Sequence, residues 1–279
     1  MDFLQQTFER TKQEKRAAIV GYITAGDPDL ERSFEIIDAA CASGLDVLEL
    51  GIPFSDPMAD GVVIQRASGR AIKAGMTLAK GIEFVRELRK RHELPIILFS
   101  YFNPIFVFGV EKFVREAVDV GVDGVLVVDL PSENAGEILQ YVNGNTKNTE
   151  NNTSVKNSPR GQFHFIRLIA PTTDIERRRK ILHDADGFIY VISRHGVTGG
   201  NSNKIDWNKL GNEINSMRQE TNTPICVGFG ISTPQDVQAV GNIANGAIIG
   251  SAIQKLIETN PNNAKQLVTK FIQDLRNPK

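Results

Sequence analysis

The sequence predicts an α/β protein built as a closed (β/α)8 or TIM barrel, with an extra N-terminal helix and an extra short helix after the second strand. Three observations predict this fold. Eight short apolar runs lie along the 279 residues, helical periodicity fills the stretches between them, and polar or glycine-rich motifs follow the runs. Strand and helix that alternate eight times favour a closed barrel over an open sheet, where about six strands are typical.

Each apolar run has the composition of a strand buried on both faces. The runs are rich in β-branched residues and lack polar alternation, as parallel strands covered by helices require. The predicted strands span residues 17–23, 46–51, 95–101, 124–130, 163–170, 187–193, 224–230 and 246–252.

The stretches between these runs repeat apolar residues at helical spacing. They predict helices around residues 30–44, 81–92, 111–121, 175–185 and 233–244. The last opens on Thr233 as an N-cap with Pro234 in the first turn. Periodicity in residues 1–20 predicts the extra N-terminal helix, and residues 64–75 predict the short helix after the second strand.

Residues 143–162 are rich in Asn, Ser and Thr and have almost no apolar side chains. This composition predicts a low-complexity surface insertion within a single barrel domain that covers residues 1–279. Because the segment follows a helix and precedes a strand, we expect it on the barrel face opposite the active site, where insertions are tolerated.

Charge and composition favour a small-molecule or protein partner. Thirty-two basic and 33 acidic side chains leave a net charge of −1, which provides no electrostatic footprint for nucleic acid or an anionic membrane. The N-terminus lacks the basic start and the continuous apolar stretch expected of a signal peptide, and no apolar run approaches the roughly 20 residues that span a bilayer. Cys41 and Cys226 lie in apolar segments and are expected to be buried thiols. These features predict a cytoplasmic protein.

Catalytic groups in a barrel of this class come from the carboxyl ends of the strands. Glu49 interrupts the run VLELG, where both strand faces should pack apolar side chains. A buried carboxylate is costly unless it is paired or neutral, so Glu49 is either a general acid–base with a raised pKa or a structural group satisfied by an arginine or hydroxyl. Asp60 lies in the following loop, SDPMADG, which can fold back over the strand end. Asp56, in SDP, is more typical of a turn.

Glycines after the later strands point to a phosphate ester as substrate. GFGIS after the seventh strand and GSA after the eighth allow backbone N–H groups to approach an anion, although GFG alone also suits a strand–turn–helix connection. GVTGG, beside Arg194 and His195, predicts a lid over the site or a plain flexible loop.

Several other chemistries are disfavoured. The eight predicted strands carry no lysine for a Schiff base, and the four histidines show no metal-ligand spacing with the carboxylates. No Gly-x-Gly-x-x-Gly motif follows a strand. Metal-free acid–base chemistry on a phosphate ester is therefore the expected reaction class.

The stretch LELGIPFSDPMADG resembles the signature of the tryptophan synthase alpha chain family, and GYITAGDPD, YFNPI, VDLP, LIAPTT, SRHGVTGG, GFGIS and GSAI follow in the family's order. The resemblance implies retro-aldol cleavage of indole-3-glycerol phosphate to indole and glyceraldehyde 3-phosphate. Glu49 matches the residue expected to protonate indole C3 and help remove the glycerol hydroxyl proton. Asp60 matches the carboxylate that stabilises the indole N–H.

The resemblance also implies substrate-binding residues. Tyr190 matches a tyrosine near Glu49, and Thr198 matches a lid threonine that contacts Asp60. The matching phosphate-binding positions are Gly199, Gly230, Gly250 and Ser251. The positions matching an indole pocket, which could equally be barrel core, are Tyr22, Ile64, Phe99, Tyr101 and Phe229. Two residues depart from the family pattern: Val62 stands where proline is common, and His195 replaces a small residue.

The family works as an αββα assembly whose separate β chain carries pyridoxal phosphate and receives indole through a tunnel. The resemblance therefore implies no cofactor in this chain. Contacts with the β chain are expected from residues 53–60, 101–109 and 196–200, and the PIFVF run is unusually apolar for a loop, as an interface requires. The alternatives are a free-standing lyase, an inactive α-like regulator of a β chain, and another phosphate-binding barrel, which would lack SDPMADG.

Overall fold

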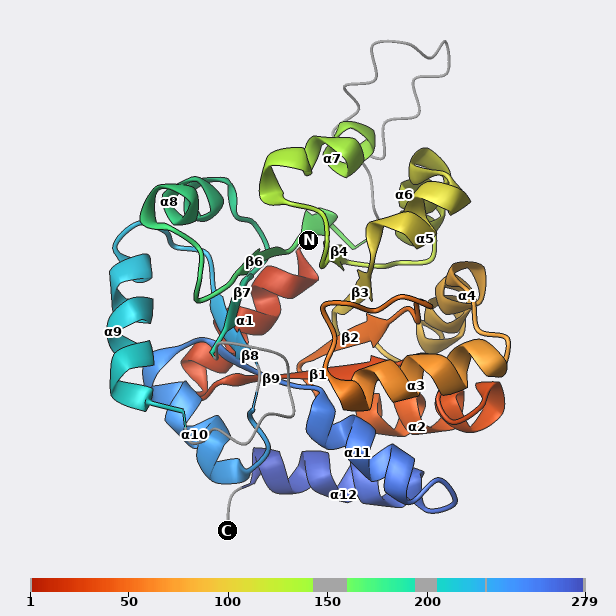
Figure 1. Ribbon diagram of the computed structural model, residues 1–279. Helices are drawn as coiled ribbons and strands as arrows, with labels where there is room; N and C mark the ends of the chain where they lie inside the picture. The colour runs from red at the N-terminus through yellow and green to blue at the C-terminus, as the bar shows by residue number, and fades with distance from the viewer. Residues whose placement is uncertain (1, 143–159, 194–204, 229, 278–279) are drawn as a thin grey trace.

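The computed structural model describes residues 2–142, 160–193, 205–228 and 230–277. In these ranges, nine strands form one parallel sheet that curls into a nearly closed barrel, with helices around it (Figure 1). The strands are β1 (Ala18–Thr24), β2 (Val47–Gly51), β3 (Ile96–Ser100), β4 (Gly124–Val127), β5 (His164–Phe165), β6 (Arg167–Ile169), β7 (Ile189–Ile192), β8 (Ile225–Gly228) and β9 (Gly246–Ile249). The predicted (β/α)8 fold is confirmed.

The sheet order is β5-β4-β3-β2-β1-β9-β8-β7-β6, so its two ends are the halves of one predicted strand, 163–170. Ile166 separates these halves. Its N–H donates to the Val125 carbonyl of β4, whereas the next residue, Arg167, pairs with Ile189 of β7. The chain therefore changes pairing partner at Ile166, which is where the barrel closes.

Twelve α-helices are described. They are α1 (Phe3–Gln13), α2 (Leu30–Ala42), α3 (Val62–Lys73), α4 (Leu78–Leu88), α5 (Phe102–Phe108), α6 (Val110–Asp119), α7 (Gly136–Val142), α8 (Ile175–Asp184), α9 (Trp207–Arg218), α10 (Pro234–Ile243), α11 (Ser251–Thr259) and α12 (Ala264–Arg276). Helix α1 is the predicted N-terminal helix, and α3, which begins at Val62, is the predicted helix after the second strand.

Several sequence predictions were wrong in detail, and the predicted strand 124–130, for example, ends at Val127. The PIFVF run is not a loop, because it forms most of helix α5. Pro104 lies in the first turn of this helix, where proline does not remove a needed hydrogen bond. The predicted last strand, 246–252, is also too long: it ends at Ile249, and Ser251 opens α11.

Of the predicted insertion, residues 143–159 lie outside the described part of the chain. Arg160, near its end, is buried. Its guanidinium forms ion pairs with Asp123 (2.9 Å) and Glu93 (2.6 Å) and stacks 3.8 Å from the centroid of the Phe3 ring. The described end of this segment is therefore anchored to the barrel.

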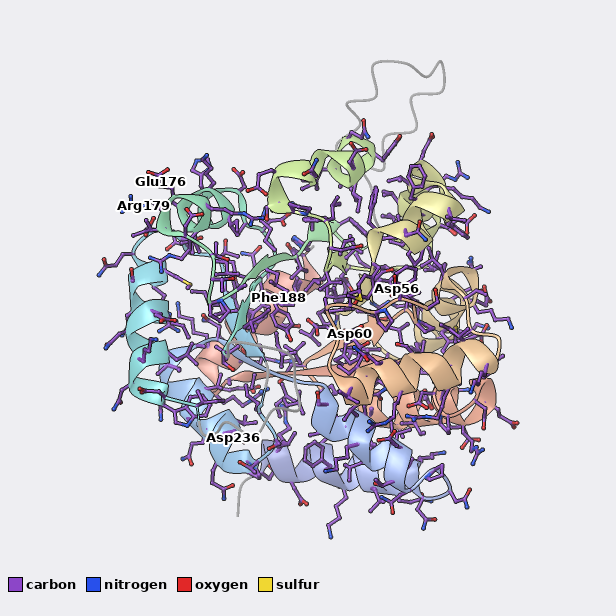
Figure 2. All side chains as sticks on the ribbon, viewed as in Figure 1. Asp56, Asp60, Glu176, Arg179, Phe188 and Asp236 are labelled. Atoms are coloured by element: carbon purple, nitrogen blue, oxygen red, sulfur yellow. The ribbon has the colours of Figure 1, made fainter. Side chains whose placement is uncertain are left out.

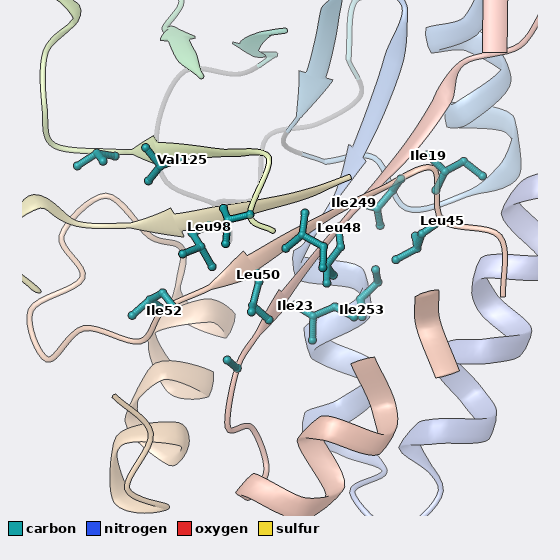
Figure 3. Close-up of a cluster of buried hydrophobic side chains, with 14 of the residues drawn as sticks. Ile19, Ile23, Leu45, Leu48, Leu50, Ile52, Leu98, Val125, Ile249 and Ile253 are labelled. Carbon is teal, nitrogen blue, oxygen red and sulfur yellow. The ribbon is translucent and has the colours of Figure 1, made fainter. Parts of the chain in front are cut away.

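Strand side chains divide between two apolar clusters. One lies between the barrel and its helices and includes Leu48, Leu50 and Ile23 (Figure 3). The other fills the barrel interior and includes Val47 of β2, together with Leu4 and Phe8 of α1. Because side chains alternate along a strand, Glu49 faces the interior as Val47 does. Helix α1 closes the amino-terminal end of the barrel, which leaves the carboxyl-terminal end for a site.

Candidate active site

Glu49 is a fully buried carboxyl group inside the barrel. It lies opposite Tyr22 of β1 and Ile97 of β3 in the sheet register. Within the described ranges, neither of its carboxyl oxygens has a hydrogen-bond partner. Burial raises the pKa of Glu49 to about 8, so the carboxyl is protonated at neutral pH. A structural role for Glu49 would require a hydrogen bond from an arginine or a hydroxyl group, and no described residue makes one.

Asp60 lies in the loop between β2 and α3, at the carboxyl end of the barrel (Figure 2). Its side chain is nearly buried and accepts a hydrogen bond of 3.1 Å from the Tyr101 hydroxyl. Burial raises the pKa of Asp60 to about 6, and the Tyr101 hydrogen bond limits that rise. At neutral pH the larger part of this group is therefore ionised.

Tyr101 and Gln65 hold the Asp60 loop in place. The Tyr101 hydroxyl accepts a hydrogen bond from the Ala59 N–H (3.0 Å), and Gln65 Nε2 donates to the Asp60 carbonyl (2.8 Å). Asp56, in the same loop, is exposed, and its carbonyl accepts from the Met58 N–H, as the predicted turn requires. Asp60, and not Asp56, is thus the carboxylate directed toward the interior.

Tyr22 of β1 and Tyr190 of β7 are buried in the barrel. Their hydroxyl groups contact Gly51 and Gly228, where any Cβ atom would overlap the phenol. Burial raises the pKa of both hydroxyls well above the usual range, and Asp60 and Glu49, which are both ionised in the pH range where tyrosine titrates, raise it further. The two tyrosines and two carboxyl groups therefore act on one another electrostatically across a shared interior space.

The rings of this space are packed in pairs. Tyr22 meets Phe99 of β3 edge-on, with centroids 5.1 Å apart, and Phe54 lies 5.0 Å from Tyr101. Ile64 is partly buried in the first turn of α3. An aromatic wall next to a protonated carboxyl group suits a flat apolar substrate that carries one polar group.

Three of the four predicted phosphate positions, Gly230, Gly250 and Ser251, follow β8 and β9, which are neighbours in the sheet. Gly230 has φ +88°, which favours glycine, and Gly250 precedes Ser251 at the start of α11. Helix α10 has a complete capping box from Thr233 and Asp236, whereas Gly250 supplies no side-chain cap. The first N–H groups of α11 are thus the ones available to an anion.

Three predicted site residues, Thr198, Gly199 and Phe229, lie outside the described residues, as do Arg194 and His195. No group of three or more His, Cys, Asp or Glu side chains that could hold a metal ion occurs in the described part of the chain. Likewise, none of the described helices is long and apolar enough to cross a membrane.

A cluster of charges beside this site was not predicted from the sequence. Asp27, in the turn after β1, pairs with Arg70 of α3, and Arg70 also pairs with Glu258 of α11. Asp27 belongs to the motif TAGDPD, whose position after a strand was the available signal. Asp27 and Arg70 are 43 residues apart, and Arg70 and Glu258 are 188 residues apart, so spacing could not identify these pairs.

Comparison with known proteins supports a common origin for this arrangement. The family model for the tryptophan synthase alpha chain matches residues 8–279. A tryptophan synthase alpha chain from Desulfatibacillum aliphaticivorans is 45% identical over 263 residues, which cover 94% of this chain and 92% of the relative. One from Geotalea daltonii is 42% identical over 271 residues, which cover 97% and 95% of the two chains.

Solved structures agree over the whole fold. Tryptophan synthase subunit alpha from Legionella pneumophila superposes with a TM-score of 0.82 at 33% identity, covering 99% of this chain and 97% of that one. A chain of the tryptophan synthase a2b2 complex from Pyrococcus furiosus gives a TM-score of 0.78 at 33% identity, covering 94% and 98%. The match extends over the barrel, including strand β2 with Glu49 and the following loop with Asp60, and the chain belongs to the tryptophan synthase alpha chain family.

Proposed function

We propose that this chain cleaves indole-3-glycerol phosphate into indole and glyceraldehyde 3-phosphate, as the α subunit of a tryptophan synthase. The observation that carries the proposal is Glu49: a fully buried carboxyl group that has no hydrogen-bond partner among the described residues, is protonated at neutral pH and faces the interior of the barrel. A group in that state can act as a general acid toward a carbon atom of an apolar ring.

Glu49 donates its proton to indole C3, and the resulting carboxylate accepts the proton of the hydroxyl on the adjacent glycerol carbon. The carbon–carbon bond then breaks. Its electron pair returns to the indole ring, and the glycerol carbon becomes an aldehyde. One proton enters and one leaves, so Glu49 ends the cycle as it began.

The role assigned to Asp60 is to stabilise the positive charge that develops on the indole nitrogen. Protonation at C3 makes the ring cationic, and an ionised carboxylate near its N–H stabilises that charge. The pKa of about 6 keeps most Asp60 side chains ionised at neutral pH, and Tyr101 fixes the carboxylate through its hydroxyl.

Substrate binding is assigned to two regions. The phosphate is bound at the start of α11 by Gly250 and Ser251, with Gly230 and, outside the described residues, Gly199. Thr198, also outside them, keeps its role as the lid threonine that contacts Asp60. The indole ring is enclosed by the aromatic and apolar group of Tyr22, Ile64, Phe99, Tyr101, Tyr190 and Phe229. Support comes from the uncapped N–H groups of α11 and the buried tyrosines.

A β chain is proposed as the partner, in an αββα assembly that passes indole onward. Pyridoxal phosphate would belong to that chain, and this chain would need no cofactor. Exposed Met58, Phe106 and Val107 support a contact at this end of the barrel. Cys41 and Cys226 are buried free thiols, which agrees with a cytoplasmic location.

The test is indole release from indole-3-glycerol phosphate by the purified chain, with and without a β chain. Glu49→Gln should lower release by about 10²–10⁴-fold, because the amide cannot donate the proton. Glu176→Gln, an exposed change on α8 (Figure 2), should release indole at the wild-type rate. Equal rates for Glu49→Gln and wild type would disprove the assigned acid.

A wild-type chain that activates a β chain without releasing indole would instead be a regulator. One that releases indole at a rate no β chain alters would be a free-standing lyase.

A further inference from the structure

A partly buried charge cluster joins three segments beside the proposed active site. Arg70 on α3 donates two hydrogen bonds to the Asp27 carboxylate: Nε lies 2.7 Å from Oδ1, and Nη2 lies 3.0 Å from Oδ2. The third nitrogen of the same guanidinium, Nη1, lies 2.8 Å from Glu258 Oε1 on α11. Asp27 is fully buried in the turn after β1. One side chain thus connects this turn, α3 and α11.

Helix α11 meets the cluster at two successive turns. Gln254 is fully buried, its Nε2 lies 3.5 Å from Asp27 Oδ2, and its Oε1 has no partner among the described residues. Glu258 follows one turn later. The helix begins at Ser251, where the phosphate is proposed to bind, and a Cβ on Gly250 would lie 3.3 Å from Tyr22 Cβ. A displacement of α11 would therefore move side chains both in the charge cluster and next to Tyr22 in the barrel interior.

Helix α3 connects the cluster to Asp60. The helix begins at Val62, two residues after Asp60, and Gln65 in its first turn donates to the Asp60 carbonyl. Arg66 lies one turn before Arg70 and pairs with Glu258 through two nitrogens, at 2.7 Å and 2.8 Å. Since a packed helix moves as a unit, the position of α3 sets the position of the Asp60 loop.

The electrostatics of the cluster differ from those of a simple surface ion pair. Burial raises the pKa of Asp27 even though Arg70 opposes the rise, so ionising this carboxyl is costly. The hydrogen bond from Arg66, followed by that from Arg70, lowers the pKa of Glu258 to about 2. A buried ion pair with a desolvation cost is weak evidence for stability and is better explained by a need for one defined geometry.

We infer that the Asp27–Arg70–Glu258 cluster is the link through which the substrate phosphate, bound at the start of α11, sets the position of Asp60. Arg70 is a positioning residue in this scheme, because it touches no reacting atom. The inference rests on the proposed function. Its physical basis is that binding energy from a remote, unreactive group can hold the reacting centre in its productive geometry.

The experiment separates the phosphate from the reacting part of the substrate. Indole-3-glycerol, which lacks the phosphate, is supplied with and without inorganic phosphite, and indole release is measured with the β chain at a fixed concentration. Phosphite should raise the wild-type rate. In Arg70→Met this activation factor should fall by at least about tenfold, because α3 loses its bond to the buried Asp27 and the half-exposed Arg66–Glu258 pair that remains holds α11 to α3 only weakly. Phosphite affinity, measured by calorimetry, should stay close to wild type.

Two variants supply the matched comparisons. Arg66→Met removes a cation from the same helix and from the same partner, Glu258, but leaves the Asp27 contact intact. It should retain the activation by phosphite. Arg70→Lys keeps the positive charge but loses the forked geometry, and it should show intermediate activation with a melting temperature near that of the wild type.

The inference is overturned if phosphite activates Arg70→Met as strongly as wild type, or if Arg66→Met loses as much activation. It is also overturned if phosphite does not activate a wild-type chain that does cleave intact indole-3-glycerol phosphate. Failure to cleave the intact substrate would contradict the proposed function itself, so the two failures are distinguishable.

Discussion

At the scale of single residues, two carboxyl groups in one interior space have different protonation states. Glu49 has no hydrogen-bond partner in the described structure and a pKa near 8, whereas Asp60 accepts from Tyr101 and has a pKa near 6. Between these values Glu49 is protonated and Asp60 is ionised. This is the combination that a general acid and a charge-stabilising carboxylate require.

The pH dependence of indole release should report both groups, and Tyr101→Phe should alter one of them. Activity should fall below about pH 6 as Asp60 is protonated and above about pH 8 as Glu49 ionises. The Tyr101 hydrogen bond lowers the pKa of Asp60, so its removal should move the acid limb of the kcat/KM profile to higher pH. The free energy of unfolding should fall by about 0.5–1.5 kcal/mol.

Tyr141→Phe on α7 is the matched control, since it removes a hydroxyl far from Asp60 in the sequence and on another helix. It should leave both limbs in place. An acid limb that does not move in Tyr101→Phe would show that this limb does not report Asp60.

The sequence pattern predicted the role of Glu49 better than it predicted the contact between Tyr101 and Asp60. Glu49 was identifiable because a carboxylate that interrupts an apolar strand needs a reason to be buried. Tyr101 was expected only in an apolar pocket. Its hydrogen bond to Asp60 joins residues 41 positions apart and depends on how the loop after β2 folds toward the end of β3, which no local pattern encodes.

At the scale of elements, the apolar runs predicted the strands because burial on both faces leaves a clear signal in composition. Helix α5 was missed because seven residues are too few to show a period of 3.6, and because aromatic and β-branched side chains have low helix propensity. The change of partner at Ile166 was also invisible, since it follows from closure of the barrel and not from the residue itself.

The attachment of α1 to the barrel depends on a buried histidine. The ring nitrogens of His164 lie 3.1 Å from Asp2, the N-cap of α1, and 3.4 Å from Asp186. Their alignment is poor for hydrogen bonds, so these contacts are best described as ion pairs of a charged ring. Asp186 is also approached by Arg167 at 3.7 Å and by Gln162 at 2.9 Å.

His164 should make stability depend on pH. Burial alone would lower its pKa, but the contacts with Asp186 and Asp2 outweigh burial and raise the pKa to about 9. The stabilisation is therefore fully present below the ordinary histidine pKa of about 6.5 and is lost as the pH rises toward 9. His164→Gln should lower the free energy of unfolding by about 1–3 kcal/mol at pH 6 and by much less at pH 10.

Urea unfolding at several pH values measures this difference. His183→Gln, at an exposed position on α8, should differ little from wild type at any pH. A His164→Gln penalty that is the same at pH 6 and pH 10 would mean that the ring acts through packing and not through its charge.

At the scale of the whole molecule, the two ends of the barrel differ. Helix α1 closes the amino-terminal end, where Phe8 lies 5.8 Å from Phe188. At the carboxyl-terminal end, Met58 is 78% exposed in the Asp60 loop, and Phe106 and Val107 are 65% and 76% exposed on α5. These apolar side chains follow adjacent strands, β2 and β3, and so lie on one side of the carboxyl-terminal end, where the proposed β chain would make contact.

The proposed partner contact predicts that Val107→Ser will weaken activation by a β chain without altering the active site. Val107 is exposed and lies on a helix that bears none of the proton-transfer groups, so indole release by the chain alone should remain near the wild-type rate. The β chain concentration that gives half-maximal activation should rise by about tenfold, because an apolar contact at the interface is lost. Ile175→Ser, which removes a 53% exposed apolar side chain from α8, is the control and should leave the activation curve unchanged. An equal shift in both variants would mean that surface hydrophobicity in general, and not the α5 face, governs association. No shift in Val107→Ser would exclude this position from the interface.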